Sequence, residues 1–250
     1  MKILVPVKQA PDPNAIRFDA SGAFAASTPR VVNEYDQYAI EEAIRLKEAG
    51  KATEVVVMTV GAATARDAIA RGLGMGADRG VLVITDDADL TAGDVAAIVS
   101  TEARDGEYDL IIVGQETSDG GSGTVGPLIA GLLDLPLVSN VVQLEAGDGT
   151  LTLGREVEDG RHIVETTLPA VVCALTGLNE PRSPSLKGIM AARKKPVEEK
   201  QASDYAVSDA HVSWGRLYAE ARVVEGTIIE TDAESAAKQV VRLLREKKLV

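Results

Sequence analysis

Cysteine and histidine are nearly missing from this sequence, which has one cysteine and two histidines in 250 residues. His162 and His211 stand apart from any cysteine or carboxylate cluster at metal-ligand spacing, so we expect no metal centre. The lone Cys173 can form neither an internal disulfide nor the ligand set of an iron–sulfur cluster. Because it stands in the apolar run LPAVVCAL, we expect it to be a buried strand thiol.

Positive charge and long apolar runs are also scarce. The formal net charge of -12 argues against nucleic acid or an anionic membrane as a general partner. No apolar stretch is long enough to span a bilayer, and the start, MKILVPVKQAPD, turns polar too early for a signal peptide. We therefore expect a soluble, cytoplasmic protein. Because we find no nucleophile–base constellation and no paired carboxylates, we expect no catalysis by this chain alone.

Strand-like and helix-like segments alternate through the first half of the chain. The strand-like runs are continuously apolar, as burial on both faces of a sheet requires. Thr91 and Asp94 could form the N-terminal cap of the third helix. This alternation predicts a parallel sheet with right-handed crossovers, a Rossmann-like doubly wound α/β fold. The predicted strands are residues 2–7, 53–61, 80–85 and 108–114, and the helices are 33–50, 63–78, 91–106 and 126–134.

The second half has a different texture. Residues 137–175 contain the turn signals GDG and EDG between alternating segments, which predicts antiparallel hairpins added to the sheet. Residues 177–200 contain three prolines and little periodicity, and the weakly patterned stretch beyond them has too little apolar content for a domain. The last segment, DAESAAKQVVRLLREKKLV, is typical of an amphipathic helix. An extended C-terminal arm ending in such a helix usually lies on a partner.

A glycine-rich loop, GQETSDGGSGTVG (residues 114–126), follows the fourth predicted strand. It has five glycines and no basic residue, and it matches no standard phosphate fingerprint. Its backbone N–H groups, with those of a helix beginning near Val125, could still hold an anion. Ser122 and Thr124 could add hydroxyl donors, and Asp119 would pin the loop or bind a ribose hydroxyl. The alternative is a flexible connection.

The chain resembles the β subunits of electron transfer flavoproteins, including FixA-type proteins, nearly from end to end. The segments that carry the resemblance are ILVPVKQAPD, VNEYDQYAIEEAIRLKE, GLGMGADRGVLV and LNEPRSPSLKGIMAARKKP. The resemblance implies a heterodimer whose α subunit carries most of a redox FAD. The β subunit of this family contributes a Rossmann-like body, a docking loop and an adenine nucleotide, which is AMP in simple carriers and a second FAD in electron-bifurcating ones.

The resemblance also implies an organisation and a role. Residues 1–192 would form the nucleotide-binding α/β domain, with the docking loop at about 179–192. Residues 193–250 would form an arm and terminal helix packed on the α subunit. The complex would accept electrons from acyl-CoA or other dehydrogenases. It would pass them to a quinone reductase, the electron transfer flavoprotein–quinone oxidoreductase, or to another acceptor.

Individual site residues follow by matching positions. A leucine at the place of Leu186 inserts into the dehydrogenase in this family, with Ile189 and Met190 on the same helix face. The alternative is that these three side chains pack on the chain's own body. Tyr35 occupies a flavin-side aromatic position, although it could equally be a half-buried helix residue. The phosphate turn would be Gly123, Thr124, Val125 and Gly126, the adenosine surroundings Pro6, Asn33, Val60 and Gly61, and the acidic loop residue Asp119.

Three departures from the family pattern matter. Many AMP-binding members have Asn-Gln-Thr before the last glycine of the turn, where this chain has Gly123-Thr124-Val125. The pattern here, followed by Gly126-Pro127, is closer to bifurcating members but also occurs in FixA-like chains, so AMP and FAD both stay open. His162 falls near a hairpin position that often holds a glutamate, and Pro13 replaces an aromatic often found near the flavin.

Three alternative functions remain at this point. The first is an electron-bifurcating, NADH-oxidising flavoprotein subunit. The second, from another class, is an adenine nucleotide-binding regulator of the universal stress type, which would need neither an α subunit nor a docking loop. The third is a structural subunit without a functional nucleotide.

Overall fold

The computed structural model describes residues 1–85, 90–205, 218 and 226–250. The chain divides into two compact units, Met1–Leu217 and Tyr218–Val250. The first unit therefore continues beyond residue 192, where the sequence placed the end of the α/β domain. His211 lies outside the described residues, and so do residues 206–217 and 219–225 of the expected arm.

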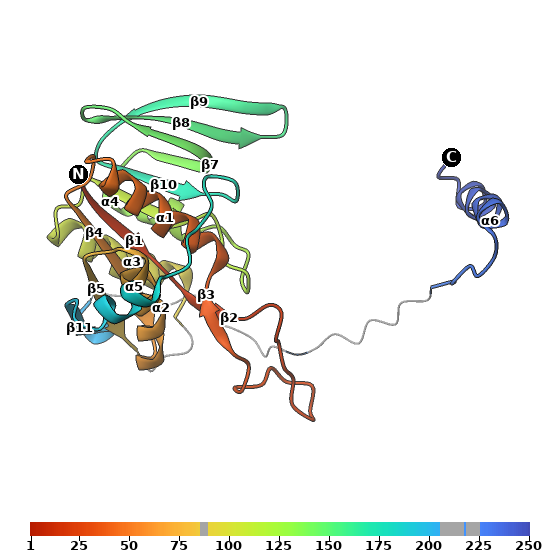
Figure 1. The fold of residues 1–250 in the computed structure, drawn as a ribbon, viewed down its shortest axis with the longest axis horizontal. Coiled ribbons are helices and arrows are strands. Elements are labelled where there is room, and N and C mark those ends of the chain that lie inside the picture. The colour runs from red at the N-terminus through yellow and green to blue at the C-terminus, as the bar shows by residue number, and fades with distance from the viewer. Residues whose placement is uncertain (86–89, 206–217, 219–225) are drawn as a thin grey trace. The chain divides into compact units, whose positions relative to one another are not determined.

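The first unit contains a mostly parallel nine-stranded sheet in the order β11-β5-β4-β1-β6-β10-β7-β8-β9, which confirms the predicted fold class (Figure 1). A small antiparallel sheet pairs β2 with β3. The strands of the large sheet are β1 (Lys2–Pro6), β4 (Glu54–Gly61), β5 (Arg79–Ile84), β6 (Leu110–Gly114), β7 (Leu137–Ala146), β8 (Thr150–Val157), β9 (Gly160–Thr167), β10 (Ala170–Ala174) and β11 (Val197–Gln201), and those of the small sheet are β2 (Gln9–Pro11) and β3 (Arg30–Val32).

Helices cover both faces of the parallel strands. On one face, α1 (Glu34–Glu48) and α2 (Arg66–Met75) pack on residues such as Val55 and Val57. On the other face, α3 (Ala92–Asp105) and α4 (Val125–Leu133) pack on Val56 and Met58. Because successive strand residues point to opposite faces, one apolar run supplies both cores. The remaining short elements are α5 (Leu186–Ala192) and the 3₁₀ turns η1 (Ala63–Ala65) and η2 (Ala202–Asp204).

The strand order reverses between β1 and β6. From β1 the chain runs outward through β4 to β5, then returns through α3 to β6 on the other side of β1. In open α/β sheets, ligands bind beyond the carboxyl ends of the strands at such a reversal. The predicted cap of α3 is present, since Thr91 and Asp94 form a capping box.

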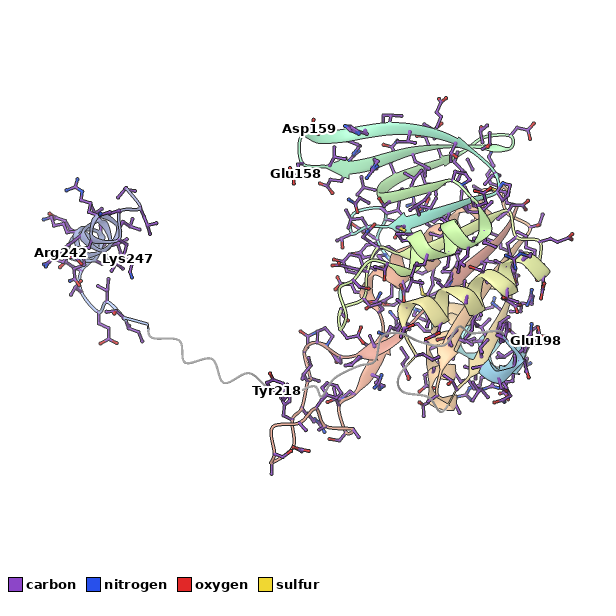
Figure 2. The ribbon with its side chains drawn as sticks, turned by 180° about the vertical axis from the view of Figure 1, so that it is seen from behind. Glu158, Asp159, Glu198, Tyr218, Arg242 and Lys247 are labelled. Carbon is purple, nitrogen blue, oxygen red and sulfur yellow. The ribbon has the colours of Figure 1, made fainter. Side chains whose placement is uncertain are left out.

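The predicted hairpins are confirmed in β7, β8 and β9, which pair antiparallel. Glu158 and Asp159 lie in the turn between β8 and β9, where the EDG signal predicted it (Figure 2). The next strand, β10, differs: it lies parallel to both β6 and β7 and between them. All five residues of β10 are buried, and a continuously apolar strand of this kind is typical of a parallel sheet interior.

The edge strand β11 is an element that the sequence analysis missed. It pairs parallel with β5, although residues 193–250 were expected to form an arm. Its sequence, VEEKQ, is charged, and Glu198 lies on it (Figure 2). Charged side chains are common on exposed edge strands because they discourage pairing with other chains. Such a short polar run has no apolar period, so its pattern did not predict a strand.

The second unit contains the predicted amphipathic helix, α6 (Ala233–Glu246). Asp232 caps its start by accepting a hydrogen bond from the Ser235 N–H at 3.0 Å. Val240, Val241 and Leu243 are exposed in this unit. The packing of the arm on a partner stays a prediction. Among the described residues, no helix is both long and apolar enough to cross a bilayer.

Candidate functional site

The glycine loop leaves the carboxyl end of β6 at the strand-order reversal and leads into α4. Two of its glycines, Gly121 and Gly123, have φ of 58°, a left-handed backbone conformation that side chains other than hydrogen disfavour. Gly121 N–H bonds the Thr117 carbonyl at 2.8 Å, which closes a turn within the loop. The loop therefore contains a closed turn between Thr117 and Gly121.

The start of α4 is open to an anion. The Thr124 side chain, at the N-cap position, makes no capping bond to any described residue. Its hydroxyl instead lies 3.1 Å from the Ser122 hydroxyl, and both residues are exposed. The first amides of a helix lack intrahelical partners and carry the positive end of its dipole. The two hydroxyls therefore lie together beside the start of α4, and their binding of an anion stays a prediction.

Gly126 lies in the predicted phosphate turn but has a packing role. It is buried in the first turn of α4, and a Cβ atom there would lie 2.5 Å from Cys173 Sγ and 2.9 Å from Val113 Cγ2. A glycine at this place lets the helix approach β6 and β10 closely, the use that nucleotide-binding folds make of a helix-start glycine. Cys173 is fully buried, as predicted, and burial raises the pKa of its thiol to about 12.

Asn33 fastens the loop to the start of α1. Its side chain is fully buried. The Asn33 amide group donates to the Glu116 carbonyl at 2.8 Å, and its amide oxygen accepts the Ser118 N–H at 3.0 Å. One side chain therefore holds two backbone groups of the glycine loop. Asn33 was predicted beside the adenosine, and the structure places it under the loop that would form that site.

A lysine distant in sequence reaches the loop from the end of β1. Lys8 Nζ lies 2.8 Å from both carboxylate oxygens of Asp119. Burial acts to raise the pKa of Asp119, but the hydrogen bond and charge of Lys8 outweigh it and lower that pKa. The loop has no basic residue of its own, so a residue 111 positions away supplies the charge that fixes it.

Beneath this pair lies a buried carboxylate, Asp36, on α1. Its oxygens accept the Lys8 N–H at 2.7 Å and the Asn33 amide at 3.0 Å. Gly114 comes so close that a Cβ there would lie 2.3 Å from Asp36 Oδ1. Burial raises the pKa of Asp36 to about 7, against the lowering effect of its hydrogen bonds, first that from the Lys8 backbone. The carboxylate joins β1, α1 and β6 at the base of the loop.

The other predicted residues lie around this edge of the sheet. Pro6 ends β1, and Val60 and Gly61 end the adjacent strand β4. Tyr35 is half-buried on α1, and its hydroxyl lies 3.4 Å from Glu116 Oε1. Burial, and then the charge of Glu116, raises the pKa of Tyr35. The structure thus collects the predicted cofactor residues at the carboxyl ends of β1, β4 and β6.

Sequence reasoning missed several polar residues that build the site. Lys8 belongs to a Val-Lys-Gln turn, but nothing in that turn indicates contact with Asp119. Asp36 is an acidic residue in the first turn of a helix, which is usually favourable for the helix dipole alone. Gln115 accepts the Asn140 N–H at 2.8 Å and so ties the loop to β7. These roles depend on pairs far apart in the sequence.

The predicted docking residues lie on α5, away from the glycine loop in sequence. Ser185 caps this helix by accepting the Gly188 N–H at 3.0 Å. Leu186 is 76% exposed, Met190 62% and Ile189 46%. The first unit therefore does not bury these side chains in its own core, which removes the alternative of internal packing within that unit. Their binding to a dehydrogenase stays a prediction.

The sequence also singled out two histidines, of which His162 lies among the described residues. His162 is exposed on β9, 3.9 Å from Asp159. In the described part of the chain, no three histidine, cysteine or acidic side chains form a group able to hold a metal ion.

Comparison with known proteins supports the resemblance seen in the sequence. A family profile described as "Electron transfer flavoprotein domain" matches residues 21–205. Similar proteins that carry the name electron transfer flavoprotein subunit beta include those of three bacteria. That of Bradyrhizobium diazoefficiens is 41% identical over 83% of this chain and 84% of its own length. That of Bacillus subtilis is 38% identical over 86% of both chains, and that of Syntrophomonas wolfei is 43% identical over 79% and 78%.

Proposed function

The chain belongs to the electron transfer flavoprotein β-subunit family, and from this premise we propose that it is half of a heterodimeric electron carrier and holds an adenine nucleotide on its glycine loop. The nucleotide is AMP, or a second FAD in the case of a bifurcating complex. Its partner is an electron transfer flavoprotein α subunit. A redox FAD shared with that subunit supplies one- and two-electron transfer when bound.

The observation that carries the proposal is the open start of α4 at the strand-order reversal. The amides of Val125 and Gly126, with the hydroxyls of Ser122 and Thr124, would hold a phosphate without a basic side chain. The positive end of the α4 dipole adds to the attraction. This donor set suits a phosphate, since every group in it can donate a hydrogen bond.

The adenosine half of the nucleotide would lie along the carboxyl ends of β1 and β4, beside Pro6, Val60 and Gly61. Asn33 and the Lys8–Asp119 pair then act on the protein side: they keep the loop in the shape that presents its donors. Tyr35, half-buried at the same edge, would face the flavin held with the α subunit.

The carrier would have three protein contacts. The arm and α6 would pack on the α subunit, where the exposed Val240, Val241 and Leu243 would become buried. Leu186, Ile189 and Met190 would dock an acyl-CoA or other flavin dehydrogenase that delivers electrons. A quinone oxidoreductase or an equivalent acceptor would remove them. A small apolar anchor with polar surroundings suits a contact that must form and dissociate repeatedly.

The test is to co-express the chain with its α subunit, purify the complex, denature it and quantify the released nucleotides by chromatography. One FAD and one AMP per heterodimer are expected of a simple carrier, and two FAD without AMP of a bifurcating complex. A heterodimer containing only one FAD and no second nucleotide would refute the cradle role of the loop. A colourless homodimer containing an adenine nucleotide would instead indicate the regulator of the universal stress type.

A further inference from the structure

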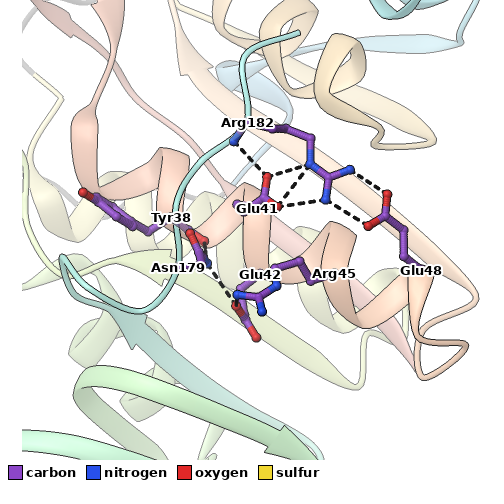
Figure 3. A network of polar contacts seen from close by, with 7 residues as sticks. All are labelled: Tyr38, Glu41, Glu42, Arg45, Glu48, Asn179 and Arg182. Carbon is purple, nitrogen blue, oxygen red and sulfur yellow. Dashed lines mark hydrogen bonds and ion pairs between the residues drawn. The ribbon is translucent and has the colours of Figure 1, made fainter. Parts of the chain in front are cut away.

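One arginine ties the segment before α5 to helix α1 (Figure 3). Arg182 directs its guanidinium between two glutamates of α1. Its Nε and Nη2 each lie 2.8 Å from an oxygen of Glu41, and its Nη1 and Nη2 lie 2.6 and 2.9 Å from the oxygens of Glu48. The Arg182 N–H also donates to Glu41 at 3.1 Å. The guanidinium binds both carboxylates in a bidentate manner, which fixes the orientation of the Arg182 side chain on α1 as well as its distance from the helix.

The two glutamates differ in burial. The Glu41 side chain is 5% exposed, whereas that of Glu48 is 58% exposed. A buried carboxylate without its partner is strongly unfavourable, so the charge of Arg182 stabilises Glu41 at this place. Hydrogen bonds with Glu48, and then with Glu41, raise the pKa of Arg182 further, and the side chain stays charged. Two turns of α1 separate the glutamates, so both lie on one helix face.

A second contact fixes the same segment three residues earlier. The Asn179 side-chain amide donates to the Tyr38 carbonyl and to Glu42, both at 3.0 Å (Figure 3). The segment 179–182 is therefore held to α1 at both of its ends.

The helix α5 itself is in contact with α2. A Cβ atom at Gly188 would lie 2.3 Å from the Gly74 carbonyl oxygen, so the two backbones are in direct contact. Beyond α5, Lys195 Nζ donates to the Leu73 carbonyl at 3.0 Å and to the Ala77 carbonyl at 2.6 Å. Leu73 lies in the last turn of α2 and Ala77 two residues beyond its end, where a cation is favourable.

From these contacts we infer that Arg182 is a positioning residue that holds α5 in one preformed arrangement, with Leu186, Ile189 and Met190 exposed for docking. A helix of seven residues is too short to be stable alone. Binding by a preformed surface avoids the entropy lost when a mobile segment becomes ordered. The inference rests on the proposed docking function. The contacts of Arg182 with Glu41 and Glu48, which we call the clamp, can nevertheless be measured without any partner.

The first test is amide hydrogen exchange on the native heterodimer. In Arg182→Gln, the amides of residues 183–192 should exchange about 10-fold faster or more. Local opening of this segment costs less free energy in the variant, because the clamp no longer has to be broken first. Arg182→Lys should lie between that variant and the wild type, since a lysine cannot bind both carboxylates through a planar fork. The matched control is Arg193→Gln, an exposed arginine at the C-cap of α5. If Arg182→Gln does not fold, Glu48→Gln weakens the same clamp at an exposed position.

The second test is reduction of the complex by an acyl-CoA dehydrogenase with its acyl-CoA substrate. Arg182→Gln should raise the KM for the carrier roughly 10-fold, the size expected from losing a preordered segment, with kcat within about twofold. Nucleotide content and reduction by dithionite, which needs no docking, should match the wild type. A merely structural role would not separate KM from kcat in this way.

Leu186→Ala in the same assay separates the inference from the function on which it rests. If Leu186→Ala raises KM but Arg182→Gln leaves KM or the exchange of α5 at the wild-type value, the positioning role is wrong. If Leu186→Ala itself has no effect on KM, the docking function fails, and the positioning role fails with it.

Discussion

The anion site at the start of α4 can be tested by one added charge, Thr124→Asp. Aspartate is a favourable N-cap residue, and the exposed Thr124 side chain makes no capping bond that the substitution would remove, so the helix should stay about as stable as before. The same carboxylate would occupy the place proposed for the phosphate. The substitution therefore separates binding from folding, which a bulky replacement of a loop glycine would not do.

The size of the effect follows from Coulomb's law. Two unit charges about 4 Å apart repel by about 4 kcal/mol at an effective dielectric constant near 20, and by about 1 kcal/mol in bulk water. Thr124 is exposed, so solvent screens part of the repulsion. We expect the nucleotide affinity to fall by about 1 to 4 kcal/mol, that is, roughly fivefold to several hundredfold.

The assay compares Thr124→Asp with Thr124→Asn, which has nearly the same shape and no charge. Each variant is purified with its α subunit at low and at high salt, and the bound nucleotide is quantified after denaturation. Thermal unfolding of the same samples checks that the fold persists. Thr124→Asn should keep most of the nucleotide, and high salt should recover part of the loss in Thr124→Asp.

One result would refute the reasoning: wild-type nucleotide content in a folded Thr124→Asp complex. A negative charge at the α4 start would then leave binding unaffected, and the phosphate would have to lie elsewhere. Equal losses in Thr124→Asp and Thr124→Asn would also contradict an electrostatic origin, because only the aspartate carries charge.

Three further predictions concern other parts of the molecule. Leu186→Ala should lower the efficiency of reduction by a dehydrogenase roughly 30-fold, as loss of a hot spot worth about 2 kcal/mol does, with an unchanged melting temperature; Lys187→Ala should not, and equal kinetics in both would contradict docking. Gly126→Ala should lower the free energy of unfolding by roughly 1 to 3 kcal/mol through overpacking. In a double-mutant cycle measured with denaturant, adding Cys173→Ala should recover part of that loss, and additive free-energy changes would contradict the contact. Burial holds the pKa of Asp36 near 7, above its usual 3.8, so the folded state binds this proton more tightly than the unfolded state does. The free energy of unfolding should therefore fall by up to roughly 4 kcal/mol as the pH rises from about 4 to 7. In urea titrations, Asp36→Asn should flatten that dependence on pH.

The sequence was informative wherever structure depends on local pattern. Continuously apolar runs predicted β1, β4, β5 and β6, and helical spacing predicted α1 to α4 and α6. Turn residues located the β7–β9 hairpins, and glycines located the loop after β6. The same reasoning missed β11 and the parallel pairing of β10, because a strand's partner depends on its position in the sheet and not on its own residues.

Within the candidate site, the sequence by itself determined which chemical groups are available: glycine amides, two hydroxyls and a helix start, with no basic residue among them. Only the tertiary structure decided how they are arranged. It brought Lys8 to Asp119, turned Asn33 toward the loop backbone, and buried Gly126 against Cys173. The physical reason is range. Periodicity and propensity act over a few residues, whereas these contacts join segments that meet only when the sheet forms and brings the carboxyl ends of its strands to one edge.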